Sequence, residues 1–182
     1  MRIPNPLCLL LPLVAACLVV LPSCSELKQA THKETKFQMG QPVALGSLTY
    51  TAIETEWKDS VQTPTGTRMP AHRFLLIKVT VTNGGGSEVT VPLLSLVDAK
   101  GQTYLEEDKG DGVPQWLGLL RILKPAQTDE GFLLFDVPQA SYRLRVTTGG
   151  DPEKELSALV EIPFQLDAIK PSGELPITPQ QR

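Results

Sequence analysis

The sequence is poor in the residues that most often carry chemistry. Its 182 residues include two histidines and three cysteines, and only 5% are aromatic. The cysteines are Cys8, Cys17 and Cys24. Because no cysteine lies beyond Cys24, the rest of the chain has no disulfide, no thiolate metal site and no cysteine nucleophile. The domain that follows must therefore be stabilised by its hydrophobic core.

Positive charge is not in excess either. The chain has 17 basic and 20 acidic residues, a formal charge of −3, and no run of lysines or arginines. Proteins that bind a phosphate backbone need a clustered basic surface. We therefore predict that nucleic acid is not a partner.

Catalytic motifs are also missing. The sequence contains no G-x-S-x-G, no G-x-G-x-x-G and no P-loop, and the glycines at 84–86 follow a predicted strand without a helix after them. A zinc site or a Ser-His-Asp triad would depend on His72, since His32 is the only other histidine. We predict that His72 is structural or solvated, that the protein is not an enzyme and that it has no cofactor.

The N-terminus has the pattern of an export signal. Residues 7–22 carry no charge and follow the single basic residue Arg2. The run is shorter than the about 20 residues of a permanent membrane helix, and it ends in small residues. We predict a signal-peptide helix over residues 1–23 that is removed.

The end of this segment resembles the lipobox of bacterial lipoproteins. The sequence Leu-Pro-Ser-Cys at 21–24 makes Cys24 the expected lipidated residue. Cys17 is the alternative, because Val-Ala-Ala-Cys at 14–17 fits the pattern better, although cleavage there leaves an apolar stub at 18–21. Secretion without a lipid is a further alternative. A lipidated Cys24 predicts a membrane partner and a location in the bacterial cell envelope, outside the cytoplasm.

The rest of the chain divides by composition. All ten aromatic residues lie between Phe37 and Phe164. We therefore expect a domain over residues 37–164, preceded by a lipidated cysteine and polar tether over 24–36 and followed by a flexible tail over 165–182. A twelve-residue coil gives the tether a reach of roughly 20 Å.

The domain has a hydrophobic period of two, which is typical of β-strands. Alternating apolar residues occur in four runs: Leu75, Ile77, Val79, Val81; Leu133, Phe135, Val137; Tyr142, Leu144, Val146; and Ala158, Val160, Ile162, Phe164. Turn residues separate these runs at intervals that suit a sandwich. We predict an all-β fold, an immunoglobulin-like antiparallel β-sandwich of about seven or eight strands.

Three segments call for local predictions. The apolar positions in residues 48–57 change parity, which a β-bulge near Ala52 would accommodate. The nearly continuous apolar run from Pro92 to Leu96 suits a strand that is covered on both sides or crosses between sheets. Asp151 to Leu159 is the one segment with the start signals of a helix, although a loop is the alternative.

Several features in this order resemble a bacterial domain of unknown function, number 4352. They are Gln41-Pro42-Val43, Gly46 to Tyr50, Glu56-Trp57, the run Phe74 to Asn83 with Gly-Gly-Gly-Ser-Glu after it, Asp98 to Gly101, Lys124-Pro125-Ala126 and Gly131 to Pro138. The resemblance covers roughly residues 37–148. It implies an immunoglobulin-like sandwich similar to secreted immunogenic proteins of mycobacteria, and a lipoprotein. It implies no catalytic residue.

One dense acidic group is a candidate calcium site. Glu106, Glu107, Asp108 and Asp111 would supply the hard oxygen ligands that Ca²⁺ prefers. The spacing fails the EF-hand pattern, because Gly110 stands where an oxygen ligand is required. A solvated loop is the prediction, and calcium binding is the alternative.

Arg143, Arg145 and Trp116 are the candidate binding residues. The two arginines share one face of a predicted strand, and Lys78 would join them if its strand is the neighbour of theirs. They form either a soluble outer face or a patch for an anionic envelope polymer. Trp116 either packs in the core, as we expect for Trp57, or presents its ring to a sugar from a loop.

The sequence thus leaves two classes of function. The one we predict is a membrane-anchored, non-enzymatic module outside the cytoplasm that binds a protein or polymer of the envelope through loops or a sheet edge. The alternative is an envelope enzyme, or a carrier of a small ligand or cation, that uses the loop carboxylates and His72.

Overall fold

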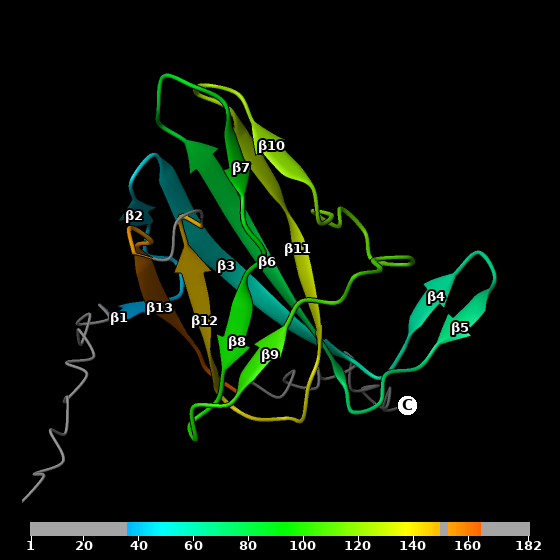
Figure 1. Cartoon of the computed structure of the whole chain (residues 1–182). Coiled ribbons are helices and arrows are strands. Elements are labelled where there is room, and N and C mark those ends of the chain that lie inside the picture. Colours follow the sequence, from blue (N-terminus) through cyan, green and yellow to red (C-terminus); the bar gives the residue numbers. More distant parts are fainter. Residues whose placement is uncertain (1–35, 150–152, 165–182) are drawn as a thin grey trace, which may run out of the picture. The chain divides into compact units, whose positions relative to one another are not determined.

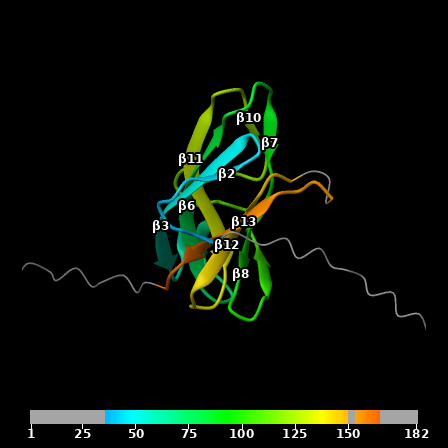
Figure 2. The same ribbon diagram turned by 90° about the vertical axis from the view of Figure 1, so that its left-hand side faces the viewer.

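Two mainly antiparallel sheets pack against each other in the computed structural model of the protein, which describes residues 36–149 and 153–164 (Figures 1 and 2). The first sheet has the order β1 (Lys36–Gln38), β13 (Ser157–Ile162), β12 (Tyr142–Thr147), β8 (Ser95–Val97) and β9 (Thr103–Leu105). The second has the order β11 (Thr128–Asp136), β6 (Phe74–Asn83), β3 (Leu48–Lys58) and β2 (Val43–Leu45). Only the pairing of β1 with β13 is parallel among these described strands.

Two short ribbons complete the fold. One pairs β7 (Val89–Val91) with β10 (Arg121–Leu123), and the other is the hairpin of β4 (Val61–Thr63) and β5 (Gly66–Arg68). Figure 1 shows that the β4–β5 hairpin projects from the end of the second sheet. Strands of three residues account for most of the difference between the about seven or eight strands predicted and the thirteen described.

The core lies between the two sheets, as the alternation predicts. Leu75, Ile77, Val79 and Val81 of β6 are all buried in it, opposite residues such as Leu144 of β12. The other three predicted runs also contribute their apolar faces to this core, with Phe164 packed at its margin. The β-sandwich prediction is therefore confirmed.

A β-bulge in β3 lets apolar side chains on both sides of it face the core. Ala52 pairs with Val79 and Glu54 pairs with Lys78, so Ile53 is the extra residue. The added residue shifts the side-chain alternation by one position. Trp57 consequently returns to the core, where its ring meets Phe164 edge to face at 5.8 Å. The predicted bulge near Ala52 is confirmed, and so is the packed role of Trp57.

The apolar segment from Pro92 to Leu96 is mostly a crossing and not a strand. β7 ends at Val91 and β8 begins at Ser95, so the chain passes from the β7–β10 ribbon to the first sheet between them. Pro92 has no N–H to donate to a ladder. The N–H of Leu94 donates instead to Oε1 of Glu106 at 2.6 Å. The prediction was right about a crossing between sheets and wrong about a strand over the whole segment.

No helix reaches Leu159, because Ser157–Ile162 forms β13. The first residues of the segment that begins at Asp151 lie outside the described part, which resumes with a turn at Glu153. Of the alternatives for this segment, the helix is therefore wrong at its C-terminal end. Within residues 36–149 and 153–164, no helix is long and apolar enough to cross a membrane.

Two tyrosine hydroxyls are bonded to the backbone inside the domain. Tyr50 of β3 donates to the carbonyl of Thr147 in β12 at 2.7 Å, which ties the two sheets together. Tyr142 donates to the carbonyl of Pro138 at 2.5 Å, a contact like the tyrosine corner of immunoglobulin-like sandwiches. Burial raises the pKa of Tyr50 far above its usual value and that of Tyr142 to about 12.

Candidate functional site

A second, smaller core lies on the outer face of the second sheet. Phe74, Leu76 and Leu134 point away from the main core and are buried by Val61 of the hairpin and Val113 of a loop. Trp116 and Phe132 pack against the same cluster. This core fixes the β4–β5 hairpin and the loop over residues 106–117 to the sheet, and it gives the hairpin a defined position.

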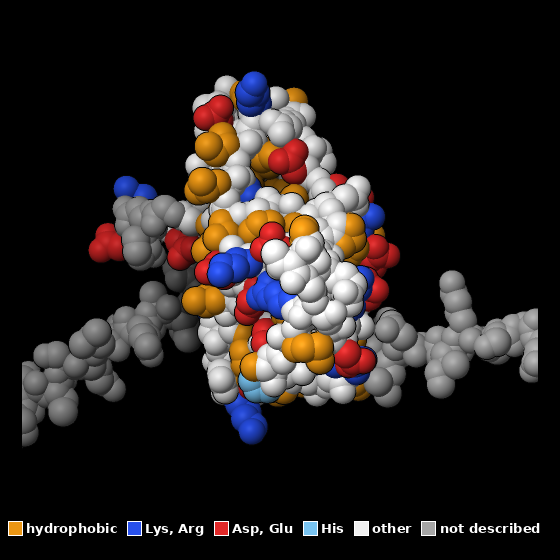
Figure 3. All heavy atoms as spheres, turned by 90° about the vertical axis from the view of Figure 1, so that its right-hand side faces the viewer, with side chains coloured by type: hydrophobic (Ala, Val, Ile, Leu, Met, Phe, Trp, Pro, Cys, Tyr) orange, Lys and Arg blue, Asp and Glu red, His pale blue; other side chains and the backbone are white. Residues whose placement is uncertain are grey.

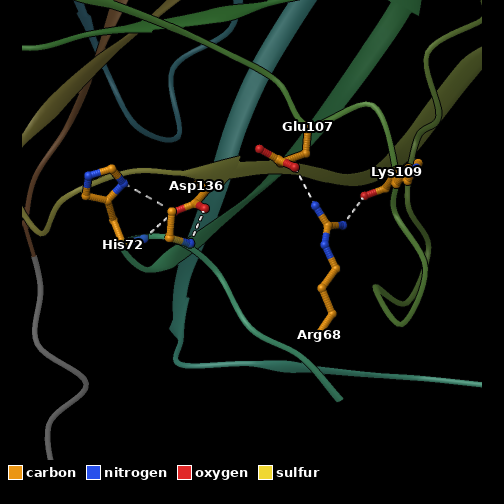
Figure 4. A network of polar contacts seen from close by, with 6 residues as sticks. Arg68, His72, Glu107, Lys109 and Asp136 are labelled. Atoms are coloured by element: carbon orange, nitrogen blue, oxygen red, sulfur yellow. Dashed lines mark hydrogen bonds and ion pairs between the residues drawn. The ribbon is translucent and has the colours of Figure 1, made fainter. Parts of the chain in front are cut away.

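Arg68 joins the hairpin to this loop (Figure 4). Its Nη1 donates to the carbonyl of Lys109 at 2.6 Å, and its Nη2 donates to the carboxylate of Glu107. The guanidinium also lies over the ring of Phe74, 5.1 Å from the centroid. The side chains of Arg68 and Glu107 are 26% and 28% exposed. Arg68 is therefore occupied by holding two segments together.

A groove runs between the hairpin and the loop, with a volume of about 430 Å³. Its lining consists of Thr63, Pro64, Thr65, Gly66, Thr67 and Arg68 on one side and Lys109 and Asp111 on the other. Thr63 already donates to the carbonyl of Gly66, and Thr67 donates to Gln62. The exposed ammonium of Lys109 and carboxylate of Asp111 are thus the charged groups that the groove can offer to a ligand. The volume falls within the range of small-ligand and segment-binding sites.

Two glycines allow the loop to approach its neighbours. A Cβ on Gly110 would lie 1.9 Å from Cδ2 of Trp116, which is shorter than any possible contact. Gly112 has a φ of 82°, and a Cβ there would lie 2.1 Å from the carbonyl oxygen of Gln62 in β4. Gly110, the residue that breaks the EF-hand pattern, must be a glycine because the ring of Trp116 lies against it.

The four carboxylates of the candidate calcium site do not converge. Glu106 is inaccessible and forms an ion pair with Arg121, whose side chain is only 3% exposed. Glu107 pairs with Arg68, whereas Asp108 and Asp111 are exposed. Among the described residues, no three His, Cys, Asp or Glu side chains are placed to hold a metal ion.

His72 lies at the end of the second sheet, beside Asp136 (Figure 4). Its Nδ1 is 3.6 Å from the Asp136 carboxylate, and the imidazole is 55% exposed. The same carboxylate accepts the backbone N–H of Ala71 at 2.5 Å and of His72 at 2.8 Å. Asp136 thus fixes the turn before β6, and the histidine has the solvated setting that we predicted.

The basic patch does not extend to Lys78. Arg143 and Arg145 lie on β12 in the first sheet, whereas Lys78 lies on β6 in the second. Lys78 is 2.9 Å from Glu130, and the hydrogen bond to that carboxylate raises the pKa of the lysine. Arg143 donates to the carbonyl of Asp98 at 2.8 Å. The predicted link to Lys78 is wrong because the strands belong to different sheets.

Trp116 is packed and is not presented as a platform. Its neighbours bind the edge of β11: the N–H of Leu117 donates to the carbonyl of Phe132 at 3.1 Å, and the N–H of Phe132 donates to Gln115 at 2.9 Å. The ring lies against Gly110 within the second core. Of the two alternatives for Trp116, the structure supports core packing.

The hairpin and its groove were missed by sequence reasoning. The turn Thr-Pro-Thr-Gly at 63–66 is a recognisable signal of a hairpin. No local signal indicates that Arg68 reaches a loop about 40 positions later in the chain, because the contact depends on how β6 and β11 place the two segments.

Comparison with known proteins agrees with this fold. Among solved structures, the chain is similar to the yjhA protein of Bacillus subtilis, with 17% identity, 69% of this chain and 98% of that one covered, and a TM-score of 0.52. It is also similar to the secreted protein MPT63 of Mycobacterium tuberculosis, with 14% identity, 73% and 99% coverage, and a TM-score of 0.51. At these identities the similarity establishes the fold alone.

A third similar structure is a functionally unknown protein of Listeria monocytogenes, with 8% identity, 70% and 84% coverage, and a TM-score of 0.51. No curated protein matches the chain. The sequence pattern of the domain of unknown function DUF4352 matches residues 37–155, which is most of the chain and contains the hairpin, the groove and the second core. The resemblance seen in the order of turns and strands is confirmed, and the chain belongs to the DUF4352 family.

Proposed function

We propose that the protein is a lipid-anchored, non-enzymatic binding module of the cell envelope, and that the groove beside the β4–β5 hairpin holds a protein or polymer of the envelope. The observation that carries this proposal is the fixation of a projecting hairpin by Arg68 and by the second core. A hairpin held in this way presents a binding surface with little loss of conformational freedom.

The charges of the groove indicate the kind of ligand. Lys109 and Asp111 are two positions apart and of opposite sign, so the loop side of the groove has no net charge from them. Threonine methyl groups and Pro64 supply apolar surface on the other side. A neutral segment that carries both hydrogen-bond donors and acceptors, such as a glycan or an extended peptide, matches this combination.

The test of the groove is a co-sedimentation assay with insoluble cell-wall polymer from the producing bacterium. We expect Lys109→Ala to reduce the bound fraction about fivefold, because one charge-assisted hydrogen bond is lost. Folding should be unaffected, since Arg68 binds the backbone carbonyl of Lys109 and not its side chain. Lys100→Ala, at an exposed lysine on the β8–β9 turn, is the matched control and should bind normally. Equal binding by both variants would contradict the proposal.

The lipid anchor rests on Cys24 and the apolar segment before it. Several acyl chains, at about 0.8 kcal/mol for each buried CH₂, hold a protein on a membrane permanently. The prediction is that Cys24→Ser shifts the full chain from the membrane fraction to the soluble or culture fraction. Cys17→Ser should leave the chain in the membrane fraction. Mass spectrometry of the N-terminal peptide identifies the acylated residue, and a peptide that starts at Cys17 would overturn the assignment.

A further inference from the structure

The corner of the domain where β6 ends is built around one asparagine side chain. Asn83 has no exposed surface, and its Nδ2 donates to the carbonyl of Ser87 at 2.8 Å and to that of Leu123 at 3.0 Å. Its Oδ1 accepts the N–H of Gly85 at 2.9 Å. Both N–H groups and the oxygen of the amide therefore have partners, and the side chain joins the end of β6 to the loop before β7 and to the end of β10.

The backbone around Asn83 is bound in the same corner. The N–H of Asn83 donates to the carbonyl of Gln127 and its carbonyl accepts the N–H of Ala126, both at 2.9 Å. The N–H of Gly84 donates to the carbonyl of Ser47 at 2.8 Å. Figure 1 shows the loops that follow β6 and β10 at the top of the domain, and Figure 3 shows charged side chains of both signs on the surface at that end. Asn83 is therefore buried beneath an end of the domain that faces water.

The residue pair Asn83-Gly84 is chemically labile in an open chain. The backbone nitrogen of the residue after an asparagine can attack the side-chain Cγ, and glycine hinders this attack least because it has no Cβ. The chain has two asparagines, and Asn5 precedes a proline, whose nitrogen carries no hydrogen. Asn83 is therefore the asparagine of this chain at which the reaction can occur.

The native corner opposes this reaction at both of the groups that take part. The attacking nitrogen of Gly84 donates its hydrogen to Ser47, and the amino group that would leave Asn83 donates to two carbonyls. A cyclisation would break these bonds inside a buried corner, where the separated groups find no water to replace their partners. The reaction therefore requires that the corner opens first.

We propose that Asn83 is a modification site that records the opening of this corner: the folded chain protects it, the opened chain deamidates, and the product is not readmitted to the native corner. In the opened chain, the nitrogen of Gly84 bonds to Cγ of Asn83 and loses its hydrogen, and the Cγ–Nδ2 bond breaks with release of ammonia. One water molecule then opens the succinimide at either carbonyl and gives aspartate or isoaspartate. This proposal does not depend on the groove or on the lipid anchor.

The native corner has the wrong hydrogen-bond partners for either product. An ionised carboxylate has no hydrogen to donate to the carbonyls of Ser87 and Leu123, so oxygens would face oxygens in a site without exposed surface. Isoaspartate also lengthens the main chain by one carbon between Asn83 and Gly84, whose N–H groups are both bound to neighbouring segments. A chain that has reacted therefore loses the bonds that close the corner.

The test of protection is peptide mass spectrometry of the full chain, held at mildly alkaline pH in buffer and in urea. The peptide that contains Asn83 should exchange NH₂ for OH at least about tenfold faster in urea, because only the open form reacts. Gly84→Ala should slow the reaction in urea at least about fivefold, since its Cβ hinders the attack. In the folded chain that Cβ would lie 3.8 Å from the nearest atom, the carbonyl oxygen of Ser47, so the variant also folds.

The fate of the product is tested by diluting partly reacted chains out of urea and treating them with trypsin. Chains that retain Asn83 should refold and resist digestion. The reacted form should be at least about fivefold less frequent among the surviving chains than in the sample before digestion, because an open corner is cleaved.

Each other outcome overturns the proposal. Equal rates in buffer and in urea would show that the fold gives no protection, and no reaction in urea would show that the pair is not labile. An unchanged rate in Gly84→Ala would mean that the nitrogen of Gly84 is not the attacking group. Survivors of trypsin that carry the modification as often as the whole sample would show that the native corner accepts the product.

Discussion

Glu106→Gln is expected to lower the free energy of unfolding by about 3–5 kcal/mol, although it changes the shape of the side chain very little. The substitution leaves the guanidinium of Arg121 buried without a counter-charge, and that arginine is 3% exposed. Removal of one member of a buried ion pair costs more than the pair itself contributes, because the remaining charge stays desolvated. Urea denaturation of the full chain measures this loss, and the slope of the free energy of unfolding against urea concentration should stay unchanged.

Glu107→Gln is the matched control, since it removes the same charge from the next residue. Glu107 and Arg68 are each about one-quarter exposed, so water replaces the lost partner and the expected cost is at most about 1 kcal/mol. A double variant, Glu106→Leu with Arg121→Met, should recover a large part of the stability lost in Glu106→Gln. If Glu106→Gln and Glu107→Gln lower the free energy of unfolding by similar amounts, the burial of the Glu106–Arg121 pair does not set the cost of breaking it.

These two glutamates also show why the acidic loop could not be interpreted from sequence. They are identical and adjacent, yet Glu106 pairs with Arg121 inside the domain and Glu107 pairs with Arg68 on the hairpin. Each partner is distant in sequence, and the sheets decide which one each carboxylate meets. Counting the carboxylates of the loop suggests the same cation site whether the side chains converge or each binds a separate arginine.

The sandwich itself was predictable because a strand's alternation depends only on neighbouring residues. The change of parity in residues 48–57 was enough to place the bulge that the pairing of Ala52 and Glu54 shows. The crossing from Pro92 to Leu94 was harder to predict. An apolar segment has the same sequence pattern whether its N–H groups donate to a neighbouring strand or, as for Leu94, to a carboxylate.

The second core did leave a signal in the sequence. Residues 74–77 of β6 are continuously apolar, although alternation accounts only for Leu75 and Ile77 in the main core. Phe74 and Leu76 point to the opposite face, and an apolar residue there requires a cover. The sequence therefore indicates that β6 is covered on both faces at this end. It does not indicate that the hairpin and the loop at 106–117 form the cover.

The loop at 106–117 belongs to both cores. At the start of the loop, Glu106 forms the ion pair with Arg121 at the margin of the main core. At its end, Val113 and Trp116 pack in the second core. Between them, Glu107 and the carbonyl of Lys109 hold Arg68 of the hairpin. The geometry of the groove thus depends on this one segment, and Gly112 in it decides how closely the segment approaches the hairpin.

Gly112→Ala is expected to detach this loop from the hairpin and to cost about 2–4 kcal/mol. An alanine must adopt a φ of 82°, and its Cβ would lie 2.1 Å from the carbonyl oxygen of Gln62, which belongs to the backbone and cannot rotate away. Limited trypsin digestion measures the detachment, since cleavage after Arg68 and Lys109 should become faster as their contact opens. Binding to cell-wall polymer should fall with it.

Gly101→Ala separates the two contributions to this loss of stability, which are the left-handed backbone and the contact of the new Cβ with Gln62. Gly101 has nearly the same φ, 84°, but a Cβ there would have nothing within 4 Å. Its variant should lose only about 1–2 kcal/mol, the cost of the left-handed backbone, and should resist trypsin at Arg68 as the parent chain does. The excess loss in Gly112→Ala then measures the close approach of loop and hairpin. If both variants lose the same stability and digest at the same rate, the groove does not depend on that approach, and the loop must be held by Arg68 and the second core alone.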